Sequence, residues 1–313
     1  MHILITGGAG FIGSHLAKHY SEKGDQIYIV DNLLTGNKKN LEILNPKAFT
    51  FYKQDILDFD WSKLPKIDIA YHLASPASPI QYKRYPIETM RVNTEGTFML
   101  LNFCRDQKCD RFVFTSTSEI YGDPLEHPQK ETYWGNVNTL GERACYDEAK
   151  RFAETIIVNY HKKFNIDVRL ARIFNTYGPN MEIDDGRVVS NFIVQGLKNL
   201  PFTIYGDGSQ TRSFCYVSDM VLGLVKLGET NGISGEVINL GNPEEKSINE
   251  LATLIKKATN SSAKITNVQI GGDDPKKRKP NIEKADQLLD WKPTVSLMEG
   301  LNKTIGYFKN ILK

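Results

Sequence analysis

The stretch that most constrains the fold of this chain is residues 2–16, HILITGGAGFIGSHL, where a short apolar run meets three glycines spaced G-x-x-G-x-x-G. The apolar residues predict a buried strand. We expect Gly7 to make the tight turn, Gly10 to let the backbone approach a pyrophosphate, and Gly13 to let the next helix pack closely. Free N–H groups at the start of that helix would face the anion. The spacing predicts a dinucleotide-binding turn; the alternative is a strand-to-helix turn without a ligand.

A second apolar run, residues 26–30, ends in Asp31, which lies 18 residues after Gly13. An acidic residue at about this distance accepts hydrogen bonds from the adenosine ribose in dinucleotide-binding folds. Because its charge would repel a 2′-phosphate, the sequence favours NAD over NADP. Residues 32–37 predict a polar turn beside the adenosine. Asp55, where a third predicted strand ends, either bonds the adenine or serves an ordinary turn.

Length and composition set broad limits on the kind of protein. The 313 residues allow one large or two modest domains with a sizeable core. A net charge of +2 gives no strong field for nucleic acid or an acidic membrane, so we expect small molecules or a second copy of the chain as partners. No apolar run approaches the ~18 residues of a membrane span, and a strand at the very start leaves no room for a signal peptide. We therefore expect a cytoplasmic protein.

The cysteines and histidines predict no metal site. Cys104, Cys109, Cys145 and Cys215 form no C-x-x-C pair and have no histidine nearby at a metal-binding spacing. We expect buried, reduced thiols.

Strands and helices alternate along the first half of the chain. Strands are predicted at residues 66–74, 111–117 and 167–172, and helical spacing fills residues 88–106. This alternation implies parallel βαβ units with right-handed crossovers, and hence a doubly wound, Rossmann-type parallel sheet of the α/β class. Ligands bind such sheets at the carboxyl ends of the strands.

The loop after the strand at residues 66–74 is a predicted wall of the cofactor pocket. Pro76 and Pro79 are expected to prevent a helix from starting there at once. His72 is interpreted as a packed strand residue rather than a catalyst.

The second half predicts a substrate-binding unit. Helices are expected at residues 188–197, 218–227 and 247–258, the last two each beginning with a serine cap. A strand at residues 237–240 is expected to return to the main sheet. We therefore predict a nucleotide-binding domain over residues 1–174, with a return at about 212–240. A smaller, interleaved α+β substrate domain is predicted over residues 175–313.

One helix carries a candidate base. Tyr146 and Lys150 are four residues apart, so both side chains lie on one helix face. An ammonium beside a phenol lowers the phenol pKa and so favours a base that can take a hydroxyl proton. The pattern is weak alone and gains weight from the glycine loop and from residues 117–119 at a strand end.

Together these motifs resemble the nucleotide-sugar branch of the extended short-chain dehydrogenase/reductase family, and within it the UDP-glucuronate decarboxylases. The similarity covers nearly the whole chain. The segments that carry it are TGGAGFIGSHL (6–16), HLASPASP (72–79), STSEIYGDP (116–124), CYDEAKR (145–151), RIFNTYGP (172–179), DGRVVSNFI (185–193), YGDGSQTRSF (205–214) and RKP (278–280).

The resemblance implies a bound, recycling NAD that allows UDP-glucuronate to become UDP-xylose through a UDP-4-keto intermediate. The implied catalytic residues are Tyr146 and Lys150 at C4, Thr117 at the 4-oxygen, and Ser118, Glu119 and Arg278 in the loss of CO₂, with the donor of the C5 proton left open among the last three. The implied cofactor contacts are Gly7, Gly10, Phe11, Ile12, Gly13, Asp31, Asn32, Thr35, Gly36, Asp55, Ile56, Leu73, Ala74, Tyr146, Lys150, Thr176 and Arg187. The implied substrate contacts are Ser75, Arg91, Asn175, Tyr205, Arg212 and Arg278. Lys276, Lys277 and Lys279 are expected to be solvated.

The same resemblance leaves other outcomes open. A dehydratase would need a better acid than Ser118, and 4-epimerases usually lack an equivalent of Glu119. A relative that stops at the UDP-4-keto-pentose shares these residues, and a non-catalytic nucleotide sensor could keep the fold. Helices at residues 88–106 and 146–162 would form the family's four-helix contact, so a homodimer is expected.

Overall fold

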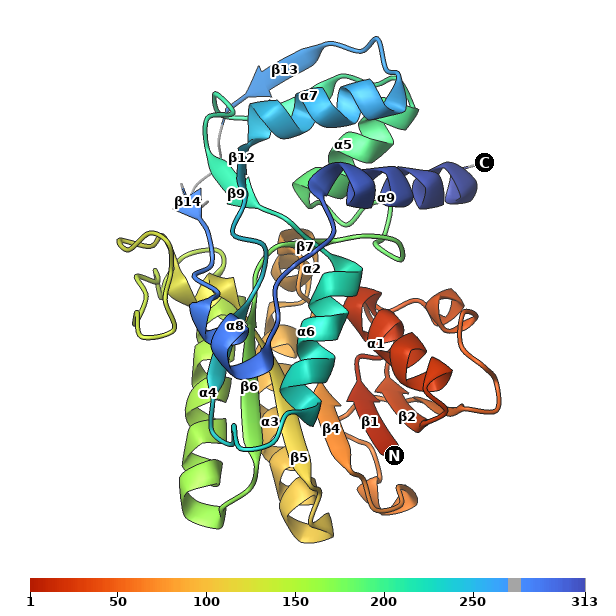
Figure 1. Ribbon diagram of the computed structural model, residues 1–313, viewed down its shortest axis with the longest axis vertical. Coiled ribbons are helices and arrows are strands. Elements are labelled where there is room, and N and C mark those ends of the chain that lie inside the picture. The colour runs from red at the N-terminus through yellow and green to blue at the C-terminus, as the bar shows by residue number, and fades with distance from the viewer. Residues whose placement is uncertain (270–276, 313) are drawn as a thin grey trace.

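A seven-stranded parallel sheet forms the larger part of the molecule in the computed structural model, which describes residues 1–269 and 277–312 (Figure 1). The spatial order is β11-β6-β5-β4-β1-β2-β3. This confirms the doubly wound parallel sheet. The strands are β1 (His2–Thr6), β2 (Gln26–Asp31), β3 (Phe49–Lys53), β4 (Ile69–His72), β5 (Arg111–Thr117), β6 (Val168–Ile173) and β11 (Val237–Leu240).

Helices cover both faces of this sheet (Figure 1). On one face α1 (Phe11–Glu22) packs beside α6 (Val217–Glu229), and on the other α3 (Pro86–Gln107) packs beside α4 (Ala144–Phe164). Each pair buries an apolar stripe against strand residues that point to its side, and two separate cores result. Apart from the edge strand β3, the sheet strands are nearly continuous runs of buried residues because both of their faces are covered.

A smaller unit sits above the carboxyl ends of the strands (Figure 1). Helices α5 (Val188–Leu197), α7 (Ile248–Thr259) and α9 (Leu297–Ile311) pack together there. Around them lie three small sheets, which pair β8 (Phe202–Tyr205) with β13 (Ile265–Val268), β7 (Thr176–Tyr177) with β10 (Cys215–Tyr216), and β9 (Thr211–Ser213) with both β12 (Glu245–Ser247) and β14 (Lys277–Arg278). The remaining short helices are η1 (Lys38–Leu41), η2 (Trp61–Lys63), α2 (Pro79–Arg84), η3 (Ser118–Tyr121) and α8 (Glu283–Leu289).

The chain passes more than once between the sheet and the smaller unit. The predicted strand at residues 237–240 is confirmed: β11 pairs in parallel with β6 and becomes the edge of the main sheet. Near the C-terminus, the indole of Trp291 donates to the Asp219 carbonyl at 3.0 Å, and the Val295 N–H donates to the Asp219 carboxylate at 2.9 Å. The last part of the chain is thereby anchored on α6. The predicted domain limits at residues 174 and 175 stay a prediction.

The predicted loop after β4 is confirmed, because no helix follows until Pro79, the first residue of α2, a position where its missing N–H costs nothing. One expectation about a helix start was wrong. Ser218 does not cap α6, because the helix already begins at Val217 with Tyr216 at the N-cap position. Ser247 does cap α7, in a reciprocal capping box with Glu250.

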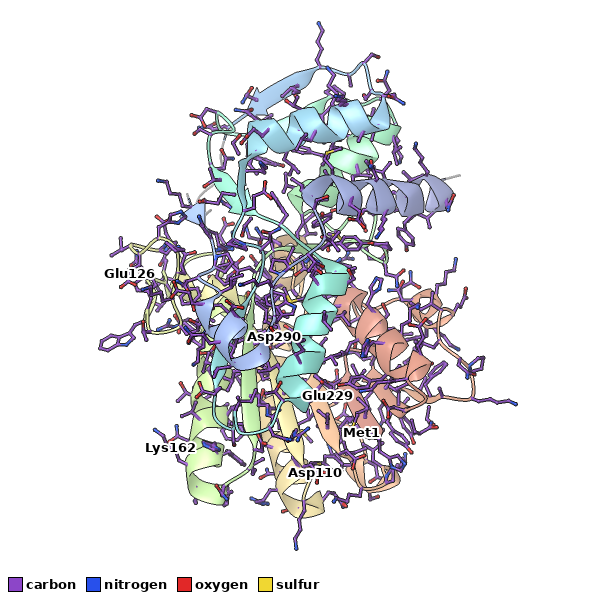
Figure 2. All side chains as sticks on the ribbon, viewed as in Figure 1. Met1, Asp110, Glu126, Lys162, Glu229 and Asp290 are labelled. Atoms are coloured by element: carbon purple, nitrogen blue, oxygen red, sulfur yellow. The ribbon has the colours of Figure 1, made fainter. Side chains whose placement is uncertain are left out.

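Two ion pairs link neighbouring segments at the lower end of the molecule. The amino group of Met1 lies 2.6 Å from Asp25, and Lys23 lies 2.6 Å from Glu229 at the end of α6. Met1 and Glu229 lie at this same end in Figure 2. All four cysteines are free, and only Cys145 is not fully buried. Within residues 1–269 and 277–312, no helix is long and apolar enough to cross a membrane.

Candidate active site

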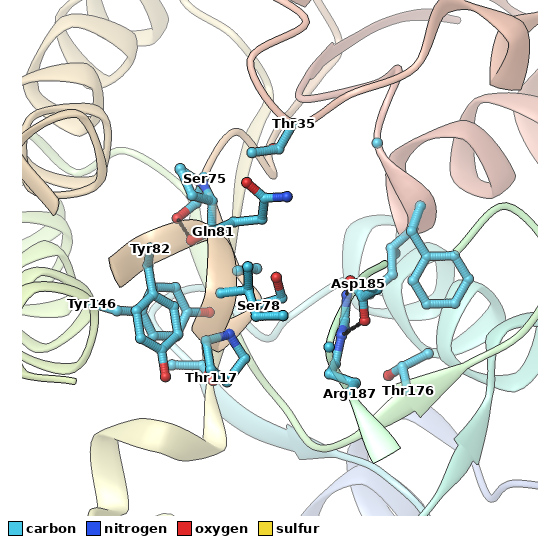
Figure 3. Close-up of a pocket in the computed structure, with 18 of the residues that line it drawn as sticks. Thr35, Ser75, Ser78, Gln81, Tyr82, Thr117, Tyr146, Thr176, Asp185 and Arg187 are labelled. Carbon is cyan, nitrogen blue, oxygen red and sulfur yellow. Dashed lines mark hydrogen bonds and ion pairs between the residues drawn. The ribbon is translucent and has the colours of Figure 1, made fainter. Parts of the chain in front are cut away.

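A cavity of about 770 Å³ opens at the carboxyl ends of the sheet strands, beneath the smaller unit. Residues that directly follow β1, β2, β4, β5 and β6 line it, as expected for an open α/β sheet. Every residue that the sequence predicts as catalytic, cofactor-binding or substrate-binding lies on its wall. Figure 3 shows ten of the lining residues by name, drawn from both halves of the chain. The cavity therefore brings the predicted residues together; their individual roles remain predictions.

The glycine loop is shaped as its spacing predicts. Gly7 has a φ of +73°, and a Cβ there would lie 2.7 Å from the Ala74 nitrogen after β4. A Cβ on Gly13 would lie 2.2 Å from the Gly7 carbonyl, so only glycine allows α1 to approach β1 this closely. Gly10 is the N-cap of α1 and supplies no side chain, which leaves the first N–H groups of the helix for an anion.

Asp31 stands at the end of β2 beside this loop. Its carboxylate accepts hydrogen bonds from the Ala9 N–H at 3.0 Å and the Leu33 N–H at 2.8 Å. Burial raises the pKa of Asp31, and the two N–H donors oppose that rise. Each oxygen keeps a lone pair for a ribose hydroxyl. Nearby, Asn32 donates to Asp55 at 2.8 Å. The predicted strand end at Asp55 was wrong, because β3 ends at Lys53, but Asp55 lines the cavity two residues beyond it.

Tyr146 and Lys150 lie on the same face of α4, as predicted, with the Lys150 ammonium 5.8 Å from the Tyr146 ring centre. The expected low phenol pKa is not found. Burial raises the pKa of Tyr146, and the hydrogen bond to Thr117 only partly opposes this. Burial also lowers the pKa of Lys150 to about 7, and its ammonium donates to the Thr115 carbonyl at 2.8 Å. The expectation counted a nearby charge and omitted the cost of burying both groups.

A carboxylate held by two arginines forms the floor of the cavity. Arg278 contacts both oxygens of Glu119, one of them at 3.1 Å, and Arg143 donates to Glu119 at 2.6 Å. All three side chains are at most 15% exposed. Although burial opposes it, the two guanidinium groups hold the pKa of Glu119 well below its usual range. Glu119 is therefore ionised, and the three groups together carry one excess positive charge.

Two residues of this site escaped the sequence-based prediction. Arg143 has no motif of its own and is brought to Glu119 by the turn before α4. Tyr82, on α2, stacks its ring on the Tyr146 ring with centres 5.0 Å apart and planes within 6° (Figure 3). The available signal for Tyr82 was a tyrosine four residues after the predicted pocket wall, which ends at Ser78.

The predicted substrate contacts are not equally well placed. Arg91 lies at the rim with its guanidinium turned to Glu95, 2.8 Å away on the same helix, so it gives weak support to a substrate role. Tyr205 is also at the rim and largely exposed. Arg212 is buried, lines the cavity and acts electrostatically on Glu119. Ser75 and Asn175 also line the cavity and are partly exposed.

The basic run near the C-terminus divides as expected. Arg278 points inward, whereas Lys277 is exposed and Lys279 is partly exposed, 3.7 Å from Glu245. Lys276 lies outside the described residues. His72 is buried, its Nδ1 lies 2.9 Å from the Thr6 hydroxyl, and burial lowers its pKa to about 3, so it is the packed residue that was predicted.

The cavity suits a dinucleotide and gives no sign of a metal. No group of histidine, cysteine or acidic side chains within the described residues could hold a metal ion. The glycine loop leaves a cradle that a Cβ would fill, Asp31 faces it, and Tyr146 with Lys150 lies farther along the same cavity. The arrangement can therefore hold a dinucleotide beside the Tyr146 phenol, with the positively charged group of Arg278, Glu119 and Arg143 next to that phenol.

Sequence comparison agrees with this geometry. Residues 3–241 match the model of the NAD dependent epimerase/dehydratase family. UDP-glucuronic acid decarboxylase 1 of Arabidopsis thaliana is 51% identical over 312 residues, which are 99% of this chain and 70% of that protein. The protein of the same name from Xenopus tropicalis is 50% identical over 312 residues, or 99% of this chain and 73% of that protein.

Solved structures share the fold at lower identity. UDP-glucose 4-epimerase of Thermotoga maritima, solved with UDP-glucose, superposes with a TM-score of 0.92 at 30% identity over 100% of both chains. UDP-glucuronic acid 4-epimerase of Bacillus cereus, solved with UDP-glucuronic acid and NAD, gives 0.89 at 35% identity over 99% of this chain and 100% of that one. The chain therefore belongs to the NAD dependent epimerase/dehydratase family, as do relatives that share half of its sequence and are named UDP-glucuronic acid decarboxylases.

Proposed function

We propose that this protein converts UDP-glucuronate to UDP-xylose, with NAD as a tightly held and recycled cofactor. The observation that carries the proposal is the Arg278–Glu119–Arg143 cluster in the same cavity as Tyr146. A positively charged floor beside a phenol base suits a sugar that bears a carboxylate. The names of the relatives support the same assignment.

NAD, when bound, supplies reversible acceptance of the hydride from C4 of the sugar. The phenol oxygen of Tyr146 takes the 4-hydroxyl proton, and Thr117, whose hydroxyl bonds that phenol, holds the 4-oxygen. Lys150 favours the phenolate by its charge. The 4-keto sugar is a β-keto acid, so its carboxylate leaves as CO₂ while the C–C bonding electrons form an enolate. A proton then adds at C5, and Tyr146 returns its proton to the 4-oxygen as the 4-keto group is reduced to the hydroxyl of UDP-xylose.

The floor cluster acts in the middle of this sequence. Guanidinium groups first bind the sugar carboxylate and then stabilise the negative charge that shifts to the enolate oxygen. Glu119 is ionised while both arginines hold it, so it can give a proton to C5 only after it has been displaced and has gained one. Ser118 and Arg278 remain the other candidate donors, since both line the cavity.

A 4-epimerase is the principal alternative, because the solved relatives of similar shape include UDP-sugar 4-epimerases. The shared fold does not separate the two reactions. The pairing of Glu119 with two arginines favours decarboxylation. A 4-epimerase either retains the carboxylate of its sugar substrate or acts on a sugar that has no carboxylate. Release of the UDP-4-keto-pentose is the second alternative and requires loss of the reduced cofactor in mid-cycle. A non-catalytic sensor is disfavoured by the intact Tyr146, Lys150 and Thr117.

One experiment separates these outcomes. The purified protein is incubated with UDP-glucuronate and NAD, CO₂ is measured, and the nucleotide sugar is followed by NMR. We expect CO₂ and UDP-xylose in equal amounts, without net NADH. UDP-galacturonate without CO₂ would identify an epimerase, CO₂ with a 4-keto-pentose and NADH would identify the shorter reaction, and no turnover would favour the sensor.

We also propose a homodimer in the cytoplasm. Apolar side chains stand exposed on the outer faces of α3 and α4, among them Ile87, Phe98 and Phe152. Phe98 contacts the Tyr160 ring of α4 edge-on at 5.9 Å, so the two helices present one surface. The four free cysteines suit a reducing compartment. Sedimentation of the purified protein tests the dimer.

A further inference from the structure

Residues 179–187, called the strap below, run along one side of the cavity between β7 and α5. The strap is tied at three points to the nucleotide half of the chain, one of them the His15 Nε2 of α1, which lies 2.9 Å from the Pro179 carbonyl oxygen. The side chain of Asn180 donates to the Ser14 hydroxyl of α1 at 3.1 Å, and that of Asn37, in the turn after β2, donates to Glu182 at 3.3 Å. The strap therefore lies against the glycine loop and the predicted adenosine turn.

An acid and a base of the strap form a two-point ion pair. Asp185 accepts from Arg187 through both oxygens, at 2.5 Å to Nε and 2.8 Å to Nη2. The Asp185 side chain is 9% exposed, whereas that of Arg187 is 31% exposed. The third nitrogen, Nη1, has no partner among the described residues. The carboxylate thus fixes the plane of the guanidinium and leaves donors free for a ligand.

The fixed guanidinium lies at the anion-binding end of the cavity. Its central carbon is 5.9 Å from the ring of Phe11, the first residue of α1. The same charge acts on Tyr146, where it lowers the phenol pKa against the larger effect of burial. Figure 3 shows the Asp185–Arg187 pair across the cavity from Tyr82 and Tyr146. Arg187 is therefore placed for the negative charge of a dinucleotide pyrophosphate.

Packing leaves the strap little freedom beside this pair. Gly186 has a φ of +80°, and a Cβ on it would lie 2.3 Å from the end of the Ile80 side chain on α2. On the other side, Asn191 of α5 donates to the Gly186 carbonyl at 3.1 Å. The backbone between Asp185 and Arg187 is thus held from two helices, and the direction of the guanidinium depends on the carboxylate.

We propose that Asp185 is a positioning residue for the cofactor: it orients Arg187 toward the pyrophosphate, so that the strap retains the dinucleotide. Without the carboxylate, the long arginine side chain regains rotamer freedom that binding must remove again. The inference rests on the proposed function only in taking NAD as the ligand. It predicts faster loss of cofactor when Asp185 is changed, although Asp185 itself adds a like charge to the site.

The test measures the dissociation rate of NAD and the NAD content of the protein as purified. Asp185→Asn is compared with the matched control Asp184→Asn, since Asp184 is the neighbouring acid and is exposed. We expect Asp185→Asn to dissociate NAD about tenfold faster or more, as for loss of one hydrogen-bonded charged pair, and Asp184→Asn to match the parent. Equal rates for the two variants would overturn the proposal.

A double-mutant cycle distinguishes positioning from a structural role. In the Arg187→Ala background, Asp185→Asn should change the dissociation rate by less than about twofold, because the group it orients is gone. An undiminished effect in that background would show that Asp185 acts independently of Arg187 and would contradict the proposal.

One further variant and one further measurement guard against misfolding. Arg187→Lys keeps the charge and loses the two-point fork, so it too should release NAD faster. Thermal unfolding of the NAD-free proteins should not distinguish Asp185→Asn from Asp184→Asn. Were the parent to bind NAD and yet release no CO₂ from UDP-glucuronate, the proposed reaction would fail while these rates still decide the role of Asp185.

Discussion

At the scale of single residues, burial and neighbouring charges together decide the protonation state of the reacting groups. Tyr146 and Lys150 are both nearly inaccessible, and each is pushed toward its neutral form. Glu119 is somewhat less enclosed, with its side chain 15% exposed, and it keeps its charge because two guanidinium groups contact it. The site therefore holds an ionised Glu119 beside a Tyr146 phenol whose pKa is raised by burial.

Tyr146→Phe removes the phenol oxygen and keeps the ring that stacks on Tyr82. We expect CO₂ release from UDP-glucuronate to fall at least about 100-fold, the low end of what a positioned base contributes. The NAD content of the protein should stay unchanged. Tyr82→Phe, which keeps both rings, is the control for altered stacking. Parental turnover by Tyr146→Phe would remove this residue from the mechanism.

Lys150 should make stability depend on pH. Its folded-state pKa of about 7 lies below the ordinary lysine value of 10.5, so between these values the unfolded chain binds the extra proton. The stability of the parent should therefore rise with pH in that window because of this group. Lys150→Met removes the dependence. The difference in unfolding free energy between the variant and the parent should therefore be about 3 kcal/mol more favourable to the variant at pH 6 than at pH 9. Urea titrations at both values measure this, and a constant difference would contradict it.

At the scale of elements, the position of α1 on β1 is set by a contact that only glycine permits. Gly13→Ala places a Cβ 2.2 Å from the Gly7 carbonyl, and backbone atoms cannot yield cheaply. We expect a loss of about 1–3 kcal/mol in unfolding free energy, the usual range for overpacking, with weaker NAD binding. Calorimetry and NAD titration measure both.

Gly306→Ala is the matched control for that substitution. Gly306 lies inside α9, and nothing stands within 4 Å of the position of its Cβ. The change should stabilise the protein by about 0.5–1 kcal/mol, because alanine favours a helix interior, and should leave NAD binding unchanged. Equal effects of the two alanines would show that the close approach at Gly13 is unimportant.

Local sequence signals predicted the elements better than the site. The bounds of β5, α5 and β11 agree with prediction, since each is a compact apolar run between polar or turn-forming residues. The predicted start of α6 does not agree, because a serine near a helix start fits more than one position of the first turn. The pairing of Glu119 with Arg278 spans 159 residues and has no local signal; only the family resemblance placed both in one site.

At the scale of the whole molecule, the exposed apolar surface on α3 and α4 predicts association. Phe152→Glu puts a charge in the middle of that surface, where the phenylalanine side chain is 52% exposed in the single chain. We expect this variant to sediment as a monomer and the parent as a dimer, since an unpaired buried charge is costly. Leu222→Glu, at an exposed leucine on α6, is the control. A parent that sediments as a monomer would contradict the dimer.

The late return of the chain to its first sheet limits how such a protein can be cut or recombined. Because β11 forms the edge beside β6, a fragment that stops at residue 174 would leave β6 as a bare edge and lack α6 on one face. Such a fragment should aggregate rather than bind nucleotide. A chimera that exchanges sugar specificity between relatives must therefore carry both α6 and β11 with its own nucleotide half, and a single crossover point will not suffice.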